Sequence, residues 1–247
     1  MTDASLALVA TLARALRAGD DARDEAVDAA LDALARAVVA AVPRDEHARR
    51  AFFIDVYNTL TLHAQRGHTR GRGLRLPGAL RVLAAQRRAY VILGGSLRID
   101  AIEHALLRDG ARDPLTKQRL LPEGDPRFAL RVPLDPRIHF TLNCGAASCP
   151  PVRVYSVGLD AEESSTALDE RLELATRSFV AATTTLEDDA KRLRLSRLFR
   201  WYEADFGGRQ GVRAFVARSL DRSAASIEGY AIEYERYDWS AEIRFER

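Results

Sequence analysis

The chain has 247 residues, of which 47% are hydrophobic and 29% are charged, so it can bury a core of ordinary size. Its 37 Lys and Arg residues nearly balance its 35 Asp and Glu residues, and a net charge of +2 gives little reason to expect a nucleic acid partner. No run of about 18 uncharged apolar residues occurs, and the N-terminus lacks the charged, apolar and small-residue order of a secretion signal. We therefore expect no membrane partner and a cytoplasmic location, where two cysteines are more often free thiols or a redox pair than a structural framework.

Residues 4–41 repeat apolar side chains at three- and four-residue spacing. This periodicity predicts two amphipathic helices, separated near residues 19–22 and ended by Pro43. A one-sided apolar stripe is what packing against a core requires. We predict that residues 1–45 form a helical extension, which packs on a single domain comprising residues 46–247.

Residues 49–64, RRAFFIDVYNTLTLHA, are apolar almost all round, which predicts a helix buried on several sides. Asn58 is then a polar group on a central element. Because an unpaired buried polar side chain costs about 1 to 3 kcal/mol, we expect Asn58 to have a dedicated partner. The glycine- and arginine-rich residues 67–78 that follow are predicted to form an exposed loop.

The middle of the chain predicts a strand, a helix and a long connection. Residues 90–93 form a short apolar run before two glycines, which is typical of a strand that ends in a tight turn. Residues 97–108 place apolar side chains on one helical face, with Glu103 and His104 beside it, where they could face a cleft. Residues 109–137 contain five prolines and predict an irregular connection.

The C-terminal half alternates short strands and helices. Strands are predicted at residues 137–142, 192–195 and 231–237, and helices at residues 159–179, 198–206 and 212–220. Residues 143–149 are small and turn-like, while Trp201 and Trp239 with their neighbouring tyrosines are predicted to pack in the core. Together these elements predict an α+β fold, in which a mostly antiparallel sheet packs on the buried helix of residues 50–64, preceded by the N-terminal helical pair.

Residues 135–155, DPRIHFTLNCGAASCPPVRVY, hold both cysteines of the chain, five residues apart, beside His139. A cysteine nucleophile needs its pKa lowered from about 8.5 toward neutrality, by a histidinium or by a helix N-terminus. Cys149 precedes Pro150, and proline favours the first position of a helix, so Cys149 is predicted at the N-cap of a short helical turn. This favours Cys149 over Cys144, which ends the predicted strand, while both stay candidates.

The general base is expected to be a histidine. His139 lies five residues from Cys144 on the predicted strand, which is about 16 Å and too far for direct contact along that strand. His104 comes from another element and can be brought beside either thiol by folding. It is therefore the favoured base, with Asn58 or His139 as a supporting polar group. Glu103 points about 100° away from His104 on a helix and is expected to pair with Asn58 or an arginine.

Five segments of the chain, in order, resemble the successive motifs of the domain of unknown function 547 family. They are AFFIDVYNTLTL, GSLRIDAIEHALLR, DPRIHFTLNCGAASCPPVRVY, LSRLFRWYEADFG and YERYDWS, and they span residues 49–240. The resemblance implies an α+β domain similar to papain-like and transglutaminase-like cysteine hydrolases, with a Cys and His centre. Phe53 and Asp55 stand where the family has tryptophan and asparagine, and some plant relatives resemble interaction proteins.

These observations favour a cysteine peptidase-like hydrolase or an acyl transferase, which attacks amide or thioester bonds of a peptide or of a small thiol or acyl substrate without a cofactor or metal. One alternative is a non-catalytic peptide- or thiol-binding module, in which the two cysteines form a reversible disulfide. Another is a zinc protein, because two thiols and two imidazoles can make a tetrahedral site. Its ligands would be Cys144, Cys149, His104 and His139.

Overall fold

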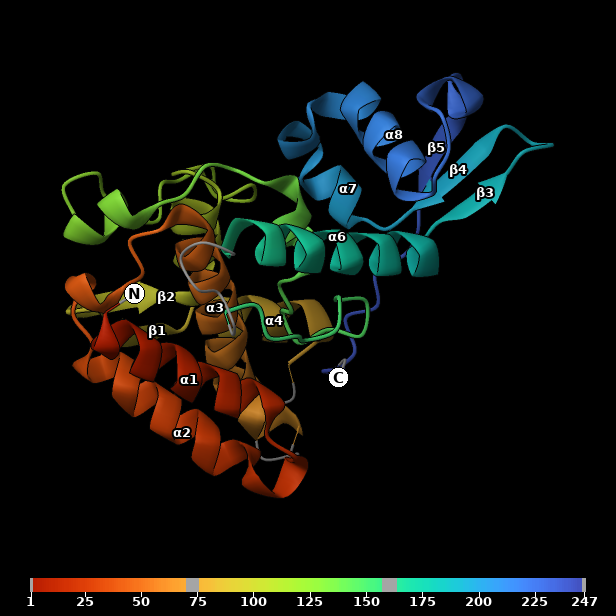
Figure 1. The fold of residues 1–247 in the computed structure, drawn as a ribbon. Helices are drawn as coiled ribbons and strands as arrows, with labels where there is room; N and C mark the ends of the chain where they lie inside the picture. Colours follow the sequence, from red (N-terminus) through yellow and green to blue (C-terminus); the bar gives the residue numbers. More distant parts are fainter. Residues whose placement is uncertain (1, 70–75, 157–163, 246–247) are drawn as a thin grey trace.

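The computed structural model describes residues 2–69, 76–156 and 164–245, and it confirms the α+β class (Figure 1). The α-helices are α1 Asp3–Arg17, α2 Asp20–Arg36, α3 Glu46–Thr69, α4 Gly78–Gln86, α5 Ile99–Ala101, α6 Ser164–Thr183, α7 Leu198–Trp201 and α8 Gly208–Ser219. The strands are β1 Ala89–Ile92, β2 Gly95–Arg98, β3 Thr185–Glu187, β4 Arg192–Leu195 and β5 Ala231–Tyr234. In these described ranges no helix combines the length and apolar character that crossing a membrane requires, while the cytoplasmic location stays a prediction.

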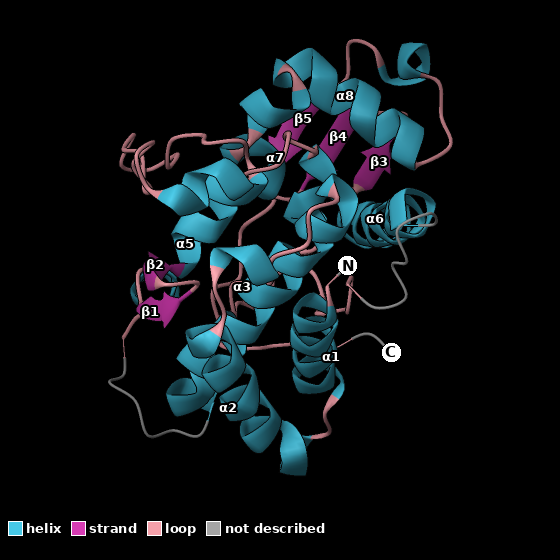
Figure 2. Cartoon of the chain, turned by 60° about the vertical axis from the view of Figure 1, so that its left-hand side comes forward, coloured by secondary structure: helices cyan, strands magenta, loops and turns pink. Residues whose placement is uncertain are grey.

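The two N-terminal helices form the predicted pair and pack on α3 (Figure 1; Figure 2). The second helix ends at Arg36, earlier than the apolar pattern predicts. Ala37 takes an extended backbone there, and the Leu34 carbonyl accepts a hydrogen bond from the Leu93 N–H (3.3 Å), so the helix end is closed by the turn between β1 and β2. The division of the chain at residue 45 stays a prediction.

The buried helix predicted at residues 49–64 is confirmed as part of α3. Every side chain from Ala51 to Leu62 is buried, because α1, α2, α4, α6 and the turn after α5 all pack against this helix. The exposed loop predicted after it is shorter than expected, since α3 extends to Thr69 and the unpredicted helix α4 begins at Gly78. Residues 70–75 of that prediction lie outside the described residues.

The strands form two small sheets. In the first, β1 and β2 make an antiparallel hairpin; in the second, β3 and β4 are antiparallel and β4 and β5 are parallel. The strands predicted at residues 90–93, 192–195 and 231–237 are confirmed as β1, β4 and β5, although β1 ends at Ile92 and β5 at Tyr234, whereas β2 and β3 were not predicted. The hairpin shares its core with α3, and α8 covers the three-stranded sheet (Figure 2).

The helix predicted at residues 97–108 begins two residues later and is wider than an α-helix. Leu97 belongs to β2, α5 starts at Ile99, and Ile102–Leu107 form a π-helix. Its wider turn is closed by the Arg108 N–H, which donates to the Glu103 carbonyl five residues earlier (2.9 Å). Such π-helical turns are rare in proteins, and those that occur are often found at functional sites.

The strand predicted at residues 137–142 is wrong, because Pro136–Phe140 form a 3-10 helix. The Asp135 carboxylate accepts a hydrogen bond from the Arg137 N–H (2.9 Å), and Pro136 suits the first helical position, so the local sequence caps a helical turn. The helical turn predicted after Cys149 is also wrong, since residues 150–155 contain no helical turn and Val152 forms a single β-bridge with Phe245.

The C-terminal helices are confirmed with shifted ends. The helix predicted from residue 159 is described from Ser164 as α6, and its predicted start lies outside the described residues. The helix predicted at residues 198–206 is α7 followed by a 3-10 helix, Glu203–Phe206, and α8 covers the last prediction. Apolar side chains of α1, α2, α3 and the hairpin form one buried cluster, and those of α7, α8 and the three-stranded sheet form a second.

Candidate active site

A cavity of about 630 Å³ is lined by side chains from both hydrophobic clusters. Five of the six predicted site residues line it, namely Cys144, Cys149, His104, His139 and Glu103. The rest of the wall comes from α4, α7, the connection after α5 and the C-terminal segment. Residues distant in sequence therefore meet around one space of the size that small-molecule sites have.

The loop that carries the thiols, residues 143–150, is held by buried polar side chains. Gln65 Nε2 donates to the Cys144 carbonyl (3.1 Å), and Arg81 donates to the Gln65 side chain and to the Gly145 carbonyl (3.0 Å). Gly145 has a φ of +87°, and a Cβ there would lie 2.7 Å from the Gln65 side chain. A larger residue would be strained in this conformation, so the cysteine loop follows one tight path beside α3.

Asn58 is not among the side chains that line the cavity, but it braces the cysteine loop from α3. Its Nδ2 donates to the Thr141 carbonyl (3.0 Å), and its Oδ1 accepts from the Asn143 N–H (3.0 Å). The prediction of a dedicated partner for Asn58 is confirmed. Because these backbone groups occupy its amide, the geometry makes Asn58 a positioning residue rather than a partner of a catalytic histidine.

The Cys149 sulfur is the point on which several hydrogen-bond donors converge. The Cys144 N–H donates to Cys149 Sγ (3.1 Å), and the Tyr237 hydroxyl lies 3.2 Å from the same atom. Burial raises the pKa of the Cys149 thiol, but hydrogen bonds from the Cys144 thiol, from Tyr237 and from two backbone N–H groups outweigh burial and lower this pKa to about 7. The site therefore favours a thiolate at Cys149 without the predicted helix N-terminus.

Cys144 provides the second thiol, which keeps its proton. Its Sγ lies 3.6 Å from the same Tyr237 hydroxyl, and both cysteines are free. The hydrogen bond to Cys149 and burial raise the pKa of the Cys144 thiol. One sulfur is therefore suited to nucleophilic attack at neutral pH, whereas its neighbour is not.

Tyr237 reaches the thiols because the C-terminal segment pairs with the cysteine loop. The Ala147 N–H donates to the Ser240 carbonyl (3.0 Å), and the Ser148 N–H donates to the Asp238 carbonyl (3.2 Å). The prediction from the sequence missed Tyr237. The one signal was its position in the YERYDWS motif, since nothing local relates this motif to a cysteine 88 residues away.

Aromatic side chains predicted to pack in the core also form one side of the cavity. Trp201, Tyr202, Tyr237 and Trp239 all line it, and Trp201 is 36% exposed. The Tyr237 ring lies 4.8 Å from the Trp201 ring and 4.5 Å from the Trp239 ring. These contacts fix the tyrosine beside the thiols and give the cavity an apolar face.

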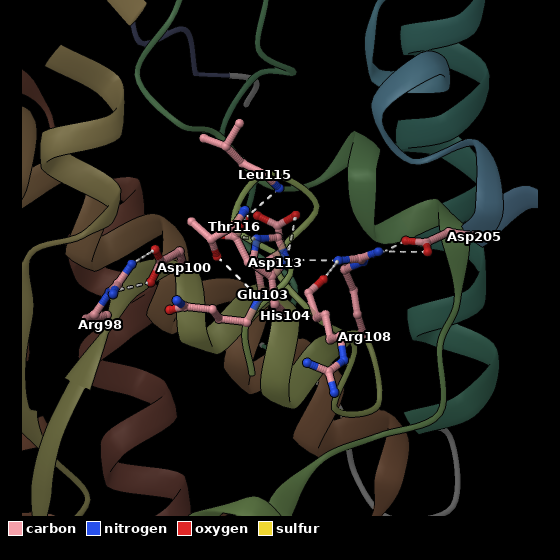
Figure 3. Close-up of polar contacts among 11 residues, drawn as sticks. Arg98, Asp100, Glu103, His104, Arg108, Asp113, Leu115, Thr116 and Asp205 are labelled. Carbon is pink, nitrogen blue, oxygen red and sulfur yellow. Dashed lines mark hydrogen bonds and ion pairs between the residues drawn. The ribbon is translucent and has the colours of Figure 1, made fainter. Parts of the chain in front are cut away.

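His139 is paired with a carboxylate that the sequence did not predict as a partner. His139 Nε2 lies 2.8 Å from Asp205 Oδ2, and Arg108 donates to both oxygens of Asp205 (2.6 and 2.8 Å; Figure 3). Burial lowers the pKa of His139, although the hydrogen bond to Asp205 acts in the opposite direction. Burial also acts to raise the pKa of Asp205, but hydrogen bonds from His139 and Arg108 outweigh it, so the pKa of Asp205 is lowered. A neutral His139 that donates from Nε2 keeps Nδ1 as the nitrogen that accepts a proton.

His104 has a different arrangement. Arg108 Nη1 lies 3.0 Å from His104 Nδ1, and because a guanidinium only donates, Nδ1 accepts this bond (Figure 3). His104 Nε2 then carries the proton, 4.0 Å from the Asp113 carboxylate. The described hydrogen bonds therefore leave His139 Nδ1 to accept a proton, whereas the accepting nitrogen of His104 is already bonded to Arg108. The separation of 16 Å between His139 and Cys144 was inferred from an extended strand, and this inference no longer applies because Pro136–Phe140 form a 3-10 helix.

Glu103 gives the cavity an acidic side. In the described part of the chain, Glu103 Oε1 is buried without a hydrogen-bond partner, and it lies 3.7 Å from His104 Nδ1. The expected pairing with Asn58 is not formed, because Asn58 is bonded to the backbone of Thr141 and Asn143. Asp100 and Asp113 also line the cavity (Figure 3), so this side stabilises positive charge on a histidine or a ligand.

The four side chains considered as zinc ligands line one cavity, but they do not converge. Within residues 2–69, 76–156 and 164–245, no group of three or more His, Cys, Asp and Glu side chains is placed to hold a metal ion. The zinc site considered from the sequence is therefore not formed in the described part of the chain.

Comparison with known proteins gives one match. A family model described as "Protein of unknown function, DUF547" matches residues 43–180, which include both cysteines, His104 and His139. Asp205 and Tyr237 lie beyond the matched residues. No curated protein and no solved structure matches the chain. The expected likeness to papain-like and transglutaminase-like hydrolases therefore stays a prediction.

Proposed function

The chain belongs to the DUF547 family of proteins of unknown function, and we propose that it is a cysteine-dependent hydrolase or acyl transferase acting on thioester or amide bonds. Cys149 is the nucleophile in this proposal. The observation that carries it is the placement of Cys149 Sγ in the cavity wall, 3.1 Å from the Cys144 N–H and 3.2 Å from the Tyr237 hydroxyl. Donors on a buried sulfur stabilise the thiolate, which is the reactive form.

The reaction has two steps. In the first, the Cys149 thiolate attacks the carbonyl carbon; the S–C bond forms, the bond to the leaving group breaks, and the leaving group takes the electron pair. In the second, water attacks the acyl carbon, His139 Nδ1 accepts a proton of this water, and the Cys149 thiolate leaves. Asp205 supports the imidazolium that forms on His139, which lies 2.8 Å away.

The contacts of the thiols favour thioesters over amides. Both described thiol contacts outside the cysteine loop are to the Tyr237 hydroxyl, and His139 bonds to Asp205. An amide leaving group must take up a proton as it departs, whereas a thiolate leaves as an anion. A thioester therefore requires no acid held against the leaving group, and the apolar wall of Trp201 and Trp239 suits its acyl chain.

Hydrolysis of a small thioester, the acetyl thioester of N-acetylcysteamine, tests the proposal. We expect the reduced protein to accelerate thiol release and Cys149→Ala to return the rate to that of buffer. The matched variant Cys144→Ala should keep part of the activity, because it retains the nucleophile but loses the hydrogen bond from the Cys144 thiol. His139→Asn, which can still bond to Asp205, should slow turnover by about 10²- to 10⁴-fold, as expected for loss of a general base. Equal activity in Cys149→Ala and the unsubstituted protein would refute the assignment of the nucleophile.

A second candidate function is a non-catalytic peptide- or thiol-binding module. The observation that favours it is the arrangement of the histidines, because the described hydrogen bonds of His104 and His139 go to Arg108 and Asp205 rather than to a thiol. This function predicts no acceleration of thioester or amide cleavage, together with saturable binding of a peptide or small thiol to both cysteine variants. The thioester assay therefore separates the two functions.

A further inference from the structure

The two cysteines are arranged for chemistry with each other. Both sulfurs lie within hydrogen-bond reach of one Tyr237 hydroxyl, at 3.2 Å and 3.6 Å, and the Cys144 N–H donates to Cys149 Sγ (3.1 Å). Both cysteines are free. From this geometry we propose that Cys144 and Cys149 form a dithiol redox centre, which reduces a peroxide and closes into an intramolecular disulfide.

The first step oxidises Cys149. Its thiolate attacks one oxygen of the peroxide, an S–O bond forms and the O–O bond breaks. The second oxygen leaves with the electron pair and takes up the proton that Cys149 lost on ionisation. Cys149 is then a sulfenic acid, and the peroxide has become water or an alcohol.

The second step closes the disulfide. Cys144 sulfur attacks the sulfur of the Cys149 sulfenic acid; the S–S bond forms, the S–O bond breaks, and the hydroxide leaves as water with the proton of the Cys144 thiol. In total, two thiols and one peroxide give one disulfide, one water or alcohol from the first step, and one water from the second. A dithiol reductant restores the two thiols by exchange.

The two cysteines differ in the way that these steps require. Cys149 is the sulfur that receives the donors, and its pKa is lowered to about 7, so it is the thiolate that meets the peroxide. Because the pKa of Cys144 is raised, its thiol keeps its proton, and the departing hydroxide takes up this proton in the second step. The cavity of about 630 Å³ gives a small peroxide room to reach Cys149, although this residue is only 2% exposed.

The fold holds the pair together before oxidation. The Cys149 N–H donates to the Ala146 carbonyl (2.9 Å), which folds the cysteine loop back on itself, and Gln65 and Arg81 fix its other side. Because the loop between the cysteines has only four residues and is already closed, forming the disulfide orders little additional chain.

Peroxide treatment of the reduced protein tests the proposal without an acyl substrate, so its outcome is independent of the proposed hydrolase. After reaction with an equimolar amount of hydrogen peroxide, thiol titration under denaturing conditions should fall from two thiols per chain to none. Peptide mapping without reductant should find Cys144 linked to Cys149 in a monomer, and dithiothreitol should restore both thiols.

Two matched variants separate the roles. In Cys144→Ser, dimedone should trap a sulfenic acid on Cys149; in Cys149→Ser, Cys144 should stay reduced at the same peroxide dose. Thermal unfolding of both variants checks that they are folded. Two free thiols remaining in the peroxide-treated protein, or disulfides only between chains, would overturn the proposal, as would a dimedone adduct on Cys144 in Cys149→Ser.

Discussion

Replacing Tyr237 by phenylalanine removes one hydrogen-bond donor from the Cys149 sulfur and keeps the aromatic ring. The hydroxyl lies 3.2 Å from Cys149 Sγ, and the ring contacts Trp201 and Trp239, so Tyr237→Phe changes the donor with little change in packing. A hydrogen bond to a charged group contributes about 1.5 to 3 kcal/mol, and 1.36 kcal/mol corresponds to one pKa unit. We therefore expect the Cys149 pKa to rise by about 1 to 2 units.

The rate of alkylation by iodoacetamide between pH 5 and pH 10 measures this pKa. Tyr237→Phe is made in a Cys144→Ala chain and compared with Cys144→Ala alone, so that only the Cys149 thiol reacts. Tyr90→Phe is the control, because its hydroxyl bonds to His63 (2.9 Å) outside this cavity and its loss should leave the pKa unchanged. A rise of less than about half a unit in Tyr237→Phe would refute the argument that the hydroxyl stabilises the thiolate.

Three further substitutions test how the site is supported. Asn58→Ala leaves two buried backbone groups without their partner and should lower the free energy of unfolding in urea by about 1 to 3 kcal/mol for each group; an unchanged midpoint would contradict this. Asp205→Asn removes the carboxylate that pairs with the buried Arg108, so the free energy of unfolding of this variant should fall by about 3 to 5 kcal/mol. A loss below about 1 kcal/mol in the same urea titration would count against the ion pair. Burial raises the pKa of Asp55 from 3.8 to about 6, so its stabilising contribution is complete below pH 4 and is lost as pH rises through 6. Between pH 4 and pH 8 the unsubstituted protein should lose up to about 3 kcal/mol of unfolding free energy relative to Asp55→Asn, and parallel pH profiles would exclude this effect.

The helices and several strands were predictable because their patterns are local. The stripe along α1 and the continuous apolar stretch of α3 each identify a helix without knowledge of the neighbours. The strand predicted at residues 137–142 failed because alternating side chains resemble a strand, whereas the Asp135 cap and Pro136 determine a 3-10 helix. Both signals lie in the sequence just ahead of the misassigned segment.

The members of the site were more predictable than their contacts. Both cysteines, His104, His139 and Glu103 line one cavity. The sequence predicted them as site residues because they are reactive side chains within short motifs. The partners that determine their chemistry could not be inferred, because His139 meets Asp205 across 66 residues and Cys149 meets Tyr237 across 88 residues. Such contacts depend on how α7 and the C-terminal segment pack, which no local pattern specifies.

The choice between His104 and His139 shows the same limit. The two imidazoles are equivalent by residue type, and their difference arises from Arg108, which donates to His104 Nδ1 and to the Asp205 carboxylate. A single arginine thus occupies the accepting nitrogen of one histidine and supports the carboxylate of the other. Only the three-dimensional arrangement shows which nitrogen accepts a proton.

The central claim is that Cys149 carries an acyl group during turnover. Intact-mass and peptide-mapping mass spectrometry after rapid acid quench of the reduced protein with the acetyl thioester of N-acetylcysteamine measures this directly. The account predicts one acetyl group on Cys149, more of it in His139→Asn because water attack is slowed, and none on Cys144. An adduct on Cys144 in Cys149→Ala at the rate of the unsubstituted protein, or no adduct in His139→Asn, would contradict it.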